Sequence, residues 1–328
     1  MADRVLVVGP AWVGDMIMSQ VIYSHLVKRD PSIVIDVLAP PSTISLLQRM
    51  PEVRRGIILK QGHGELGFGY RRRLGRRLAN ESYDHAIVTV NSFKSSLVPF
   101  FAGIPRRTGF LGEYRYFLLN DIKLLDKTQL PEMTDRFLAL VEGNSMDKVL
   151  PRLIIDVENQ KKVMKHLQLA PQKPVVAFCP GAEFGDSKQW PARHFATLGR
   201  RLVEDGYDIW LVGGPGDISV SARIEADIGE GCTNLVGKTS ILDAIDLIGL
   251  VDRVVTNDSG LMHVAAAVGT PLVAIYGSTS PAFTPPLTEL ADVLGLPLNC
   301  RPCFKRQCPL GHKNCLNHLL PDHVLARL

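Results

Sequence analysis

The stretch that most constrains the fold is residues 251–277, VDRVVTNDSGLMHVAAAVGTPLVAIYG. A short β-branched apolar run, an Ala- and Leu-rich segment that ends at Gly269, and a second apolar run predict a strand, a helix and a strand. A βαβ unit of this kind indicates a parallel sheet with helices on both faces. The chain is therefore expected to be an α/β protein.

The turn Asp258-Ser259-Gly260, between the predicted strand and helix, is a candidate phosphate site. Asp or Ser can cap the helix, and Gly260 lets a ligand approach the backbone closely. The N-terminus of such a helix offers N–H groups and a positive dipole end at the carboxyl edge of the sheet. An ordinary βαβ turn fits this stretch equally well.

The strand–helix alternation occurs twice along the 328 residues, which suits two domains of ordinary size. We predict an N-terminal Rossmann-like domain over 1–160 and a C-terminal Rossmann-like domain over 172–328, with a Cys-rich tail at 300–315. The Lys-, Gln- and Pro-rich segment 157–174 is the favoured linker. The expected architecture is two Rossmann-like domains facing a cleft, with binding loops at the strand ends of each.

The composition, 46% hydrophobic and 21% charged, is typical of a globular protein, and no apolar run reaches the roughly 20 residues that span a bilayer. The N-terminus does not resemble a signal peptide, so we expect a cytoplasmic protein. Residues 1–150 hold 20 Lys and Arg against 15 Asp and Glu, whereas the remainder is nearly balanced. This bias suits an anionic partner or membrane surface, although scatter would also explain five charges.

The first turn, residues 9–16, has the Gly9-x4-Gly14 spacing of a P-loop, but Asp15 stands where the lysine would be. The G-x-G-x-x-G fingerprint is also missing. A carboxylate at a helix N-terminus stays ionised and can act as a base toward a hydroxyl. Asp15 on its own is better explained as a residue that stabilises the helix dipole.

Three turns of the second domain are expected at one sheet edge. Gly181 lies in a turn that exposes backbone N–H groups, and Lys188 can reach a phosphate oxygen, although a lone lysine is usually solvated. Asp217 follows a glycine-rich turn and suits a ribose hydroxyl, or it is only part of that turn. Thr239 closes the next loop at the same edge.

Four segments together resemble the ADP-heptose:lipopolysaccharide heptosyltransferases: VGPAWVGDMIMSQ, NSFKSSLVPFFAGIPRRTGF, CPGAEFGDSKQWP and TNDSGLMHVAAAVGTPLVAIYGSTSPAFTPP. The resemblance implies the GT-B glycosyltransferase fold, with ADP-heptose bound by the C-terminal domain. It further implies inverting transfer of L-glycero-D-manno-heptose to the first heptose of the inner core, on heptosyl-Kdo-lipid A. The alternatives are the enzymes that add the first heptose, another nucleotide-sugar glycosyltransferase, or a non-catalytic nucleotide-sugar-binding module.

The resemblance also implies roles for residues. Asp15 matches the base that deprotonates the acceptor, and Lys188 matches the lysine that steadies the diphosphate. The implied donor-binding residues are Gly181, Lys188, Asp217, Thr239, Asp258, Ser259, Gly260 and His263. No cofactor or catalytic metal is required by this design, because protein charges take the place of the cation.

The implied acceptor carries phosphates and carboxylates, so the candidate acceptor residues come from predicted strand ends of the first domain: Asn91, Lys94, Arg106, Arg107 and Arg115. Kdo-lipid A lies in the inner membrane, and this implies a cytoplasmic protein in peripheral contact with the cytoplasmic face of that membrane. The arginine helix at 71–77 is a candidate for contact with anionic lipid, or it is a solvated helix face. No nucleic-acid partner is expected.

The tail contains Cys300, Cys303, Cys308 and Cys315. The C-x2-C spacing followed by two further cysteines suggests a structural metal site. The remaining spacing is irregular, so reduced thiols or disulfides are the alternatives.

Overall fold

The computed structural model describes residues 3–60, 64–143 and 148–328. The chain divides into two compact units, residues 1–151 and residues 152–328. Each unit is described by itself below.

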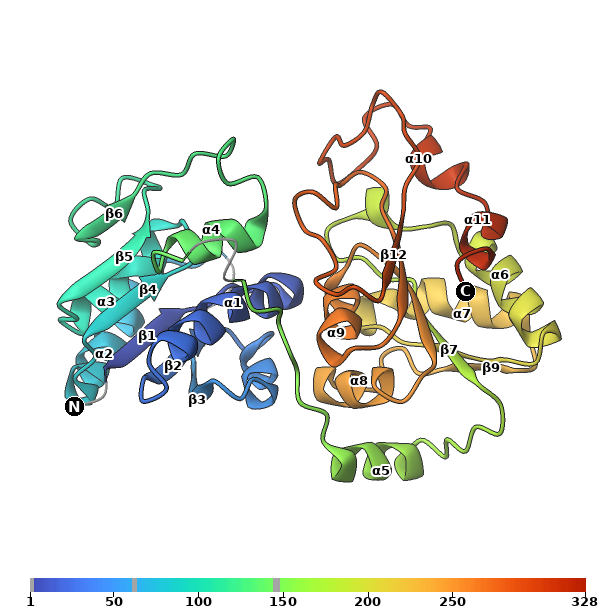
Figure 1. Cartoon of the computed structure of the whole chain (residues 1–328), viewed down its shortest axis with the longest axis horizontal. Helices are drawn as coiled ribbons and strands as arrows, with labels where there is room; N and C mark the ends of the chain where they lie inside the picture. Colours follow the sequence, from blue (N-terminus) through green and yellow to red (C-terminus); the bar gives the residue numbers. More distant parts are fainter. Residues whose placement is uncertain (1–2, 61–63, 144–147) are drawn as a thin grey trace. The chain divides into compact units, whose positions relative to one another are not determined.

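The first unit is built on a six-stranded parallel sheet in the order β3-β2-β1-β4-β5-β6. Val5, in the central strand β1, pairs with Ile35 on one side and His85 on the other. The central strands read as continuous apolar runs because helices cover both faces of the sheet (Figure 1). The strands are β1 Arg4–Val8, β2 Val34–Ala39, β3 Val53–Ile58, β4 His85–Val88, β5 Arg106–Phe110 and β6 Asp121–Lys123.

The longest helix of the first unit, α1, buries eleven consecutive residues from Met16 to Leu26. It packs against α4, whereas α2 packs against α3. The α2–α3 contact is close because Gly75 has no side chain: a Cβ there would overlap Phe101 and the carbonyl of Val98. The helices are α1 Val13–Arg29, α2 Phe68–Leu78, α3 Leu97–Phe101 and α4 Met133–Ala139, with 3₁₀ turns η1 Ile44–Arg49, η2 Ala79–Glu81 and η3 Phe93–Ser96.

The second unit repeats this strand order. Its sheet runs β12-β11-β10-β7-β8-β9, and every pair is parallel. Numbered from the first strand of the unit, this is the 3-2-1-4-5-6 order of a Rossmann fold. The two Rossmann-like units predicted from the sequence are therefore present. The strands are β7 Val175–Cys179, β8 Asp208–Leu211, β9 Cys232–Asn234, β10 Arg253–Asn257, β11 Leu272–Ile275 and β12 Ala291–Leu294.

The helices of the second unit pack in pairs, α6 with α7 and α8 with α9. In the described part of the chain, no helix is both long and apolar enough to cross a membrane. The helices are α5 Val157–His166, α6 Ala192–Glu204, α7 Ile218–Ile228, α8 Ile241–Ile248, α9 Gly260–Val268, α10 Asn314–Asn317 and α11 Pro321–Leu325, with 3₁₀ turns η5 Asp186–Lys188 and η6 Pro215–Asp217.

The segment 157–174, predicted to be a linker, is instead largely structured, because residues 157–166 form helix α5. Asp156 caps this helix by accepting hydrogen bonds from the backbone N–H groups of Glu158 and Asn159. The Asn159 amide donates to Asp246 of α8 over 2.8 Å, and the Gln160 amide donates to the Asp246 carbonyl over 2.8 Å. Polar composition suggested a linker, but these side chains attach the segment to the second unit.

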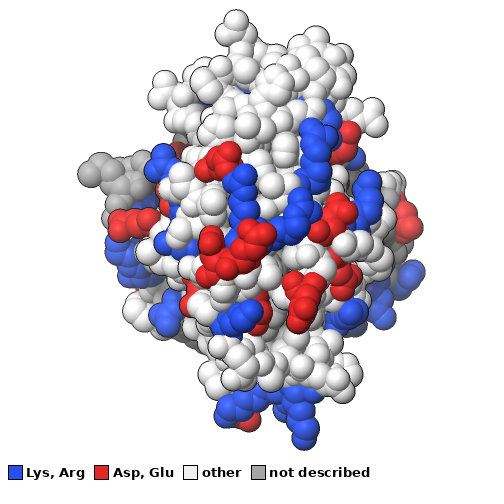
Figure 2. Space-filling model, turned by 90° about the vertical axis from the view of Figure 1, so that its right-hand side faces the viewer, with Lys and Arg blue, Asp and Glu red and all other residues white. Residues whose placement is uncertain are grey.

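Charges on the second unit are mixed. Figure 2 looks onto one face of the molecule and shows Lys and Arg interspersed with Asp and Glu, without a large area of one sign. This agrees with the near balance of charges in the second half of the sequence.

Candidate functional site

In a sheet of this order, the strand order reverses at one place, and ligands bind beyond the carboxyl ends of the two strands that flank it. In the second unit those strands are β7 and β10, which are hydrogen-bonded neighbours. The loop after β7 carries Gly181 and Lys188, and the loop after β10 carries Asp258, Ser259 and Gly260. The structure thus brings these predicted donor-binding residues to one place.

An ion pair joins the two loops. The Lys188 Nζ lies 2.6 Å from the Asp258 Oδ2, and the two side chains are only 14% and 3% exposed. The Thr279 hydroxyl donates to the same carboxylate oxygen over 2.5 Å. The alternative of a solvated surface lysine is therefore not observed: this ammonium is held between the two central loops.

Helix α9 begins directly beside this pair. Its N-cap is Ser259, whose side chain makes no capping hydrogen bond. The first N–H groups of any α-helix have no acceptor within the helix. Together with the helix dipole and the Lys188 ammonium, they form a site for an anion, and a phosphate suits its chemistry.

His263 lies in the first turns of α9 and is 4% exposed. The pKa of its imidazole is lowered to about 4, mainly by burial and also by the nearby Lys188 charge, although Asp258 acts in the opposite direction. At neutral pH the ring is therefore uncharged. It supplies a neutral donor or acceptor rather than a positive charge.

Gly181 and Asp217 lie in contact. A Cβ at position 181 would overlap the Asp217 carboxylate, so no larger residue fits there. The Gly214 N–H donates to the Asp217 Oδ2 over 3.0 Å. Burial and the charge of Glu183 raise the pKa of Asp217 above its usual value.

Thr239 lies farther from this point. It follows β9, which is the edge strand of the sheet. Its loop approaches the Asp217 loop through a hydrogen bond of 3.1 Å from the Gly237 N–H to the Gly213 carbonyl. The structure thus places the loop of Thr239 beside the loop of Asp217.

Two positioning residues were missed in the sequence. Asn257 is fully buried at the end of β10; its amide donates to the Pro180 carbonyl over 2.7 Å and accepts from the Trp190 N–H over 3.0 Å. It therefore fixes both flanks of the β7 loop. Thr279 orients Asp258. The only signal for Asn257 was its place next to the Asp258 turn.

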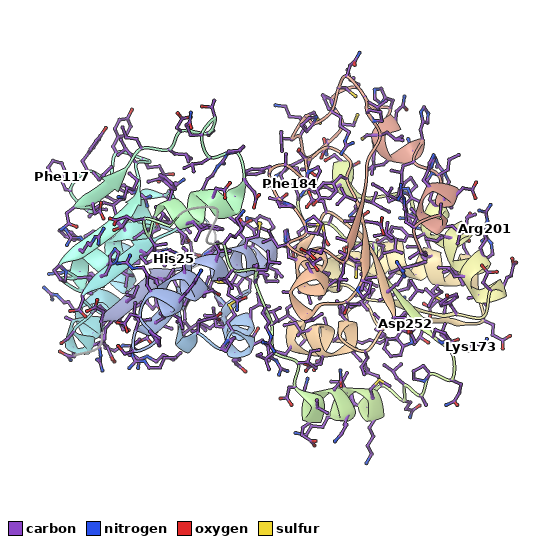
Figure 3. The ribbon with its side chains drawn as sticks, viewed as in Figure 1. His25, Phe117, Lys173, Phe184, Arg201 and Asp252 are labelled. Atoms are coloured by element: carbon purple, nitrogen blue, oxygen red, sulfur yellow. The ribbon has the colours of Figure 1, made fainter. Side chains whose placement is uncertain are left out.

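The Cys-rich tail supports the turn that carries Lys188. The Ser187 N–H donates to the Arg306 carbonyl over 3.3 Å, and the Ser187 hydroxyl donates to the Lys305 carbonyl. Two cations lie near the ring of Phe184, which is labelled in Figure 3: the Lys188 Nζ is 5.1 Å and the Arg306 guanidinium 5.7 Å from its ring centroid. The tail thus belongs structurally to the candidate donor site.

In the first unit the strand order reverses between β1 and β4. Asp15 lies in the first turn of α1, which follows β1, and it is half-buried. Asn91 and Lys94 follow β4; the Asn91 Oδ1 accepts from Arg115 over 3.3 Å, and the Lys94 Nζ donates to the Glu65 carbonyl over 3.1 Å. These three residues lie at the predicted edge.

Arg106 and Arg107 were placed wrongly by the sequence analysis. The segment RRTGF is itself a strand, β5, and both arginines lie at its amino end, with Arg106 paired to His85 at the start of β4. Parallel strands share their edges, so these side chains lie at the edge opposite to Asp15. There the Arg106 guanidinium pairs with Asp121 over 2.8 Å, and Arg107 donates to backbone carbonyls.

Arg115 was also assigned wrongly, because its side chain is fully buried. Its guanidinium donates to the carbonyls of Phe110 and Val90, each over 2.6 Å, and to the hydroxyls of Ser95 and Ser96. Burial lowers its pKa to about 10, so it remains charged at neutral pH. Arg115 fixes the β5–β6 crossover and is not accessible to an acceptor.

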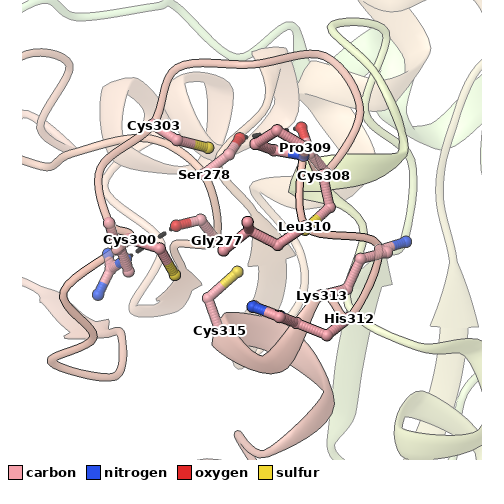
Figure 4. Close-up of a pocket in the computed structure, with 12 residues that line it drawn as sticks. Gly277, Ser278, Cys300, Cys303, Cys308, Pro309, Leu310, His312, Lys313 and Cys315 are labelled. Atoms are coloured by element: carbon pink, nitrogen blue, oxygen red, sulfur yellow. Dashed lines mark hydrogen bonds between the residues drawn. The ribbon is translucent and has the colours of Figure 1, made fainter.

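The four tail cysteines line a cavity of ≈ 20 Å³ together with His312 (Figure 4). Backbone N–H groups, above all that of Lys313, lower the pKa of Cys308, whereas burial raises the pKa of Cys315. All four thiols are free. Among the residues that the structure describes, no group of three or more His, Cys, Asp or Glu side chains is arranged to hold a metal ion, so the structural-metal hypothesis lacks support.

The two Rossmann-like units have the GT-B type of fold, which is also that of the solved heptosyltransferase reported below. Residues 71–314 match glycosyltransferase family 9 (heptosyltransferase), and the chain belongs to this family.

Curated relatives cover nearly the whole chain. Lipopolysaccharide heptosyltransferase 2 of Escherichia coli K12 is 43% identical over 99% of this chain and 97% of its own length. Lipooligosaccharide heptosyltransferase 2 of Haemophilus influenzae is 44% identical over 89% of this chain and 88% of its own. The solved structure of E. coli ADP-heptose lps heptosyltransferase II superposes with a TM-score of 0.89, at 42% identity, over 99% of this chain and 97% of that one. The resemblance inferred from the four segments is thereby confirmed.

Replacement of Arg115 by Met should lower the free energy of unfolding by about 3 kcal/mol or more, because buried carbonyls lose their donor. Denaturant unfolding followed by circular dichroism measures this. The control, Arg72→Met, changes an exposed arginine and should stay within about 0.5 kcal/mol of the unchanged protein. An Arg115→Met protein of unchanged stability would contradict the structural role.

The buried neutral His263 should make stability depend on pH. Its folded pKa of about 4 lies below the ordinary histidine pKa of 6.5, so the unfolded chain binds more protons between these values. Stability is then lost as pH falls from about 6.5 toward 4, by up to about 1.4 kcal/mol per pH unit.

The test is to compare the pH profile of unfolding free energy with that of His263→Gln. The variant should show a shallower fall below pH 6.5. Burial also lowers the pKa of His85, to about 4, and that of His194, so both contribute to the slope that remains. His85→Gln serves as the matched comparison. Identical slopes for the unchanged protein and His263→Gln would show that His263 titrates normally.

Proposed function

We propose that the chain catalyses inverting transfer of L-glycero-D-manno-heptose from ADP-heptose to the first heptose of the lipopolysaccharide inner core. The observation that carries this proposal is the anion site in which Lys188, Asp258 and the N-terminus of α9 converge. The names of relatives more than 40% identical over most of the chain support the choice of donor and acceptor.

The donor diphosphate binds at the first turn of α9, where the N–H groups of Ser259 and Gly260 meet its oxygens. Lys188 is already nearby, held by Asp258, and it turns to the phosphate when the donor arrives. The backbone at Gly181 carries no side chain, and the Asp217 carboxylate lies directly against it. Asp217 and Thr239 take the adenosine side, because their loops are joined by the hydrogen bond from Gly237 to Gly213.

The reaction is one displacement at the anomeric carbon. Asp15 accepts the proton of the acceptor hydroxyl, whose oxygen forms a bond to the anomeric carbon as the bond from that carbon to the phosphate oxygen breaks. ADP leaves with the bonding electrons. The Lys188 ammonium and the α9 N-terminus stabilise the developing charge, so that the chain's own groups serve where other enzymes use a metal.

The acceptor is heptosyl-Kdo-lipid A, bound by the first unit. Asn91 and Lys94 remain the candidates for contact with its anionic sugars, because they follow β4 at the edge where Asp15 lies. Arg106, Arg107 and Arg115 are no longer candidates. A lipid-anchored acceptor requires peripheral contact of this cytoplasmic protein with the inner membrane surface.

The activity is tested by ADP release from ADP-heptose with a purified acceptor that bears one heptose. Asp15→Asn should lower turnover by roughly 10² to 10⁴ because the general base is lost. The affinity for ADP, measured by calorimetry, should change little, because Asp15 belongs to the first unit and the candidate donor site to the second.

Asp30→Asn is the matched control, because Asp30 lies at the opposite end of α1. It should retain full turnover. Normal turnover of Asp15→Asn would exclude Asp15 as the base. A preference of the unchanged protein for an acceptor without heptose would indicate the first transfer step instead of the second, and no ADP release with either acceptor would overturn the proposed activity.

A further inference from the structure

Exposed aromatic side chains are concentrated on one side of the first unit. The described residues contain eight large aromatic side chains with substantial exposure, and only Trp12 and Phe304 lie elsewhere. The other six belong to α2, to η3 and α3, and to the crossover between β5 and β6: Phe68, Phe93, Phe100, Tyr114, Tyr116 and Phe117. Single exposed apolar side chains are common on protein surfaces, but a cluster of them often marks an interaction site.

The three segments adjoin in series: α2 packs against α3, and η3 contacts the crossover. The Phe93 N–H donates to the Glu113 carboxylate of the crossover over 2.6 Å. The Arg107 guanidinium donates to the Leu118 carbonyl over 2.8 Å and lies 5.7 Å from the ring centroid of Phe100. The ring of Phe68 packs edge-on against Phe101 at 5.3 Å between centroids. The six aromatic residues thus lie on adjoining segments of the first unit.

These adjoining segments also include the basic side of α2. Leu74, Gly75 and Leu78 of this helix are buried against the unit. Arg71 is buried as well, and its Nε donates to the Leu66 carbonyl over 2.9 Å. Four arginines remain exposed: Arg72, Arg73, Arg76 and Arg77. We call these four and the six aromatic residues the aromatic–arginine face.

The crossover presents its aromatic rings on a fixed backbone. Arg115 points inward and is fully buried, whereas its neighbours Tyr114 and Tyr116 are 87% and 53% exposed and Phe117 is 88% exposed. Figure 3 shows Phe117 at the outside of the unit. Glu113 and Tyr114 have positive φ values of 44° and 53°, a conformation that non-glycine residues seldom adopt. The hydrogen bonds of Arg115 hold the crossover in this conformation.

Exposed aromatic rings beside arginines suit the boundary between lipid and water. Tyr and Phe rings enter the headgroup region, and nearby cations are attracted to anionic lipids. The basic excess of the whole chain lies in this half, at 20 Lys and Arg against 15 Asp and Glu. A protein partner would instead be expected to meet a surface depleted in charge at its centre.

We propose that the aromatic–arginine face docks on an anionic bilayer, with Tyr114, Tyr116 and Phe117 in the headgroup region and the α2 arginines against lipid phosphates. This inference rests on the proposed function in so far as a lipid-anchored acceptor requires contact with a membrane. From the sequence, only the arginine helix at 71–77 was a candidate lipid contact. The proposed surface also includes the aromatic residues, whose burial in the headgroup region adds to the attraction between arginines and anionic lipids.

The test is flotation of the full chain with vesicles of phosphatidylethanolamine and phosphatidylglycerol, and with vesicles of phosphatidylcholine alone. The chain should float with the anionic vesicles and much less with the neutral ones. Tyr114→Ser/Phe117→Ser should lower the partition coefficient on the order of tenfold, because two largely exposed rings are lost from the interface. Arg72→Glu/Arg73→Glu should lower it by at least about tenfold and remove the dependence on salt.

Matched controls come from the second unit. Leu250→Ser removes an apolar side chain that is 43% exposed, and Lys162→Glu/Lys165→Glu reverses two exposed cations on α5. Both should float like the unchanged protein. Thermal unfolding of every variant identifies one that fails to fold, and the two face variants alter separate segments, so either one suffices for the test.

Flotation tests the docking surface and ADP release tests the proposed activity, so the two hypotheses can fail independently. If the unchanged protein does not float with anionic vesicles, or if both face variants float normally, the docking surface is refuted even when ADP release is intact. If the variants float normally but lose turnover with an acceptor stripped of its acyl chains, the face binds acceptor sugar, which also overturns the proposal. Loss of flotation with full turnover on that soluble acceptor supports it.

Discussion

The ion pair between Lys188 and Asp258 is the interaction on which the candidate donor site depends. Two nearly buried charges incur a large desolvation cost, which their attraction and further hydrogen bonds must offset. The Thr279 hydroxyl supplies one such bond. A buried pair of this kind is weak evidence for stability, and its position between β7 and β10 is better explained by function. It keeps an ammonium at the helix N-terminus, where a positive charge alone would be repelled.

The surrounding structure serves to keep that pair in place. Asn257 connects the end of β10 to both flanks of the β7 loop. From the other side, the backbone of Lys305 and Arg306 holds Ser187, the residue before Lys188. The Cys-rich tail is thus linked mechanically to the diphosphate site, although the sequence suggested only a separate structural element.

Much of the fold and part of the candidate donor site could be predicted from the sequence. The predictions that were wrong have physical causes. Short apolar runs and capped turns are local signals, so the alternation of both units and the Asp258 turn were predictable. The strand RRTGF begins with two arginines and lacks an apolar run, so Arg106 and Arg107 were placed at a strand end on the wrong sheet edge. Arg115 gave no sign of burial, because its acceptors are backbone carbonyls from segments up to 25 residues away.

A structure of the chain crystallised with ADP tests the central claim most directly. The account predicts diphosphate oxygens within hydrogen-bond distance of the Ser259 and Gly260 N–H groups, with the Lys188 Nζ moved from Asp258 to a phosphate oxygen. It also predicts the ribose beside Asp217. Diphosphate bound away from the N-terminus of α9, or a Lys188 that stays on Asp258 with ADP bound, would contradict it.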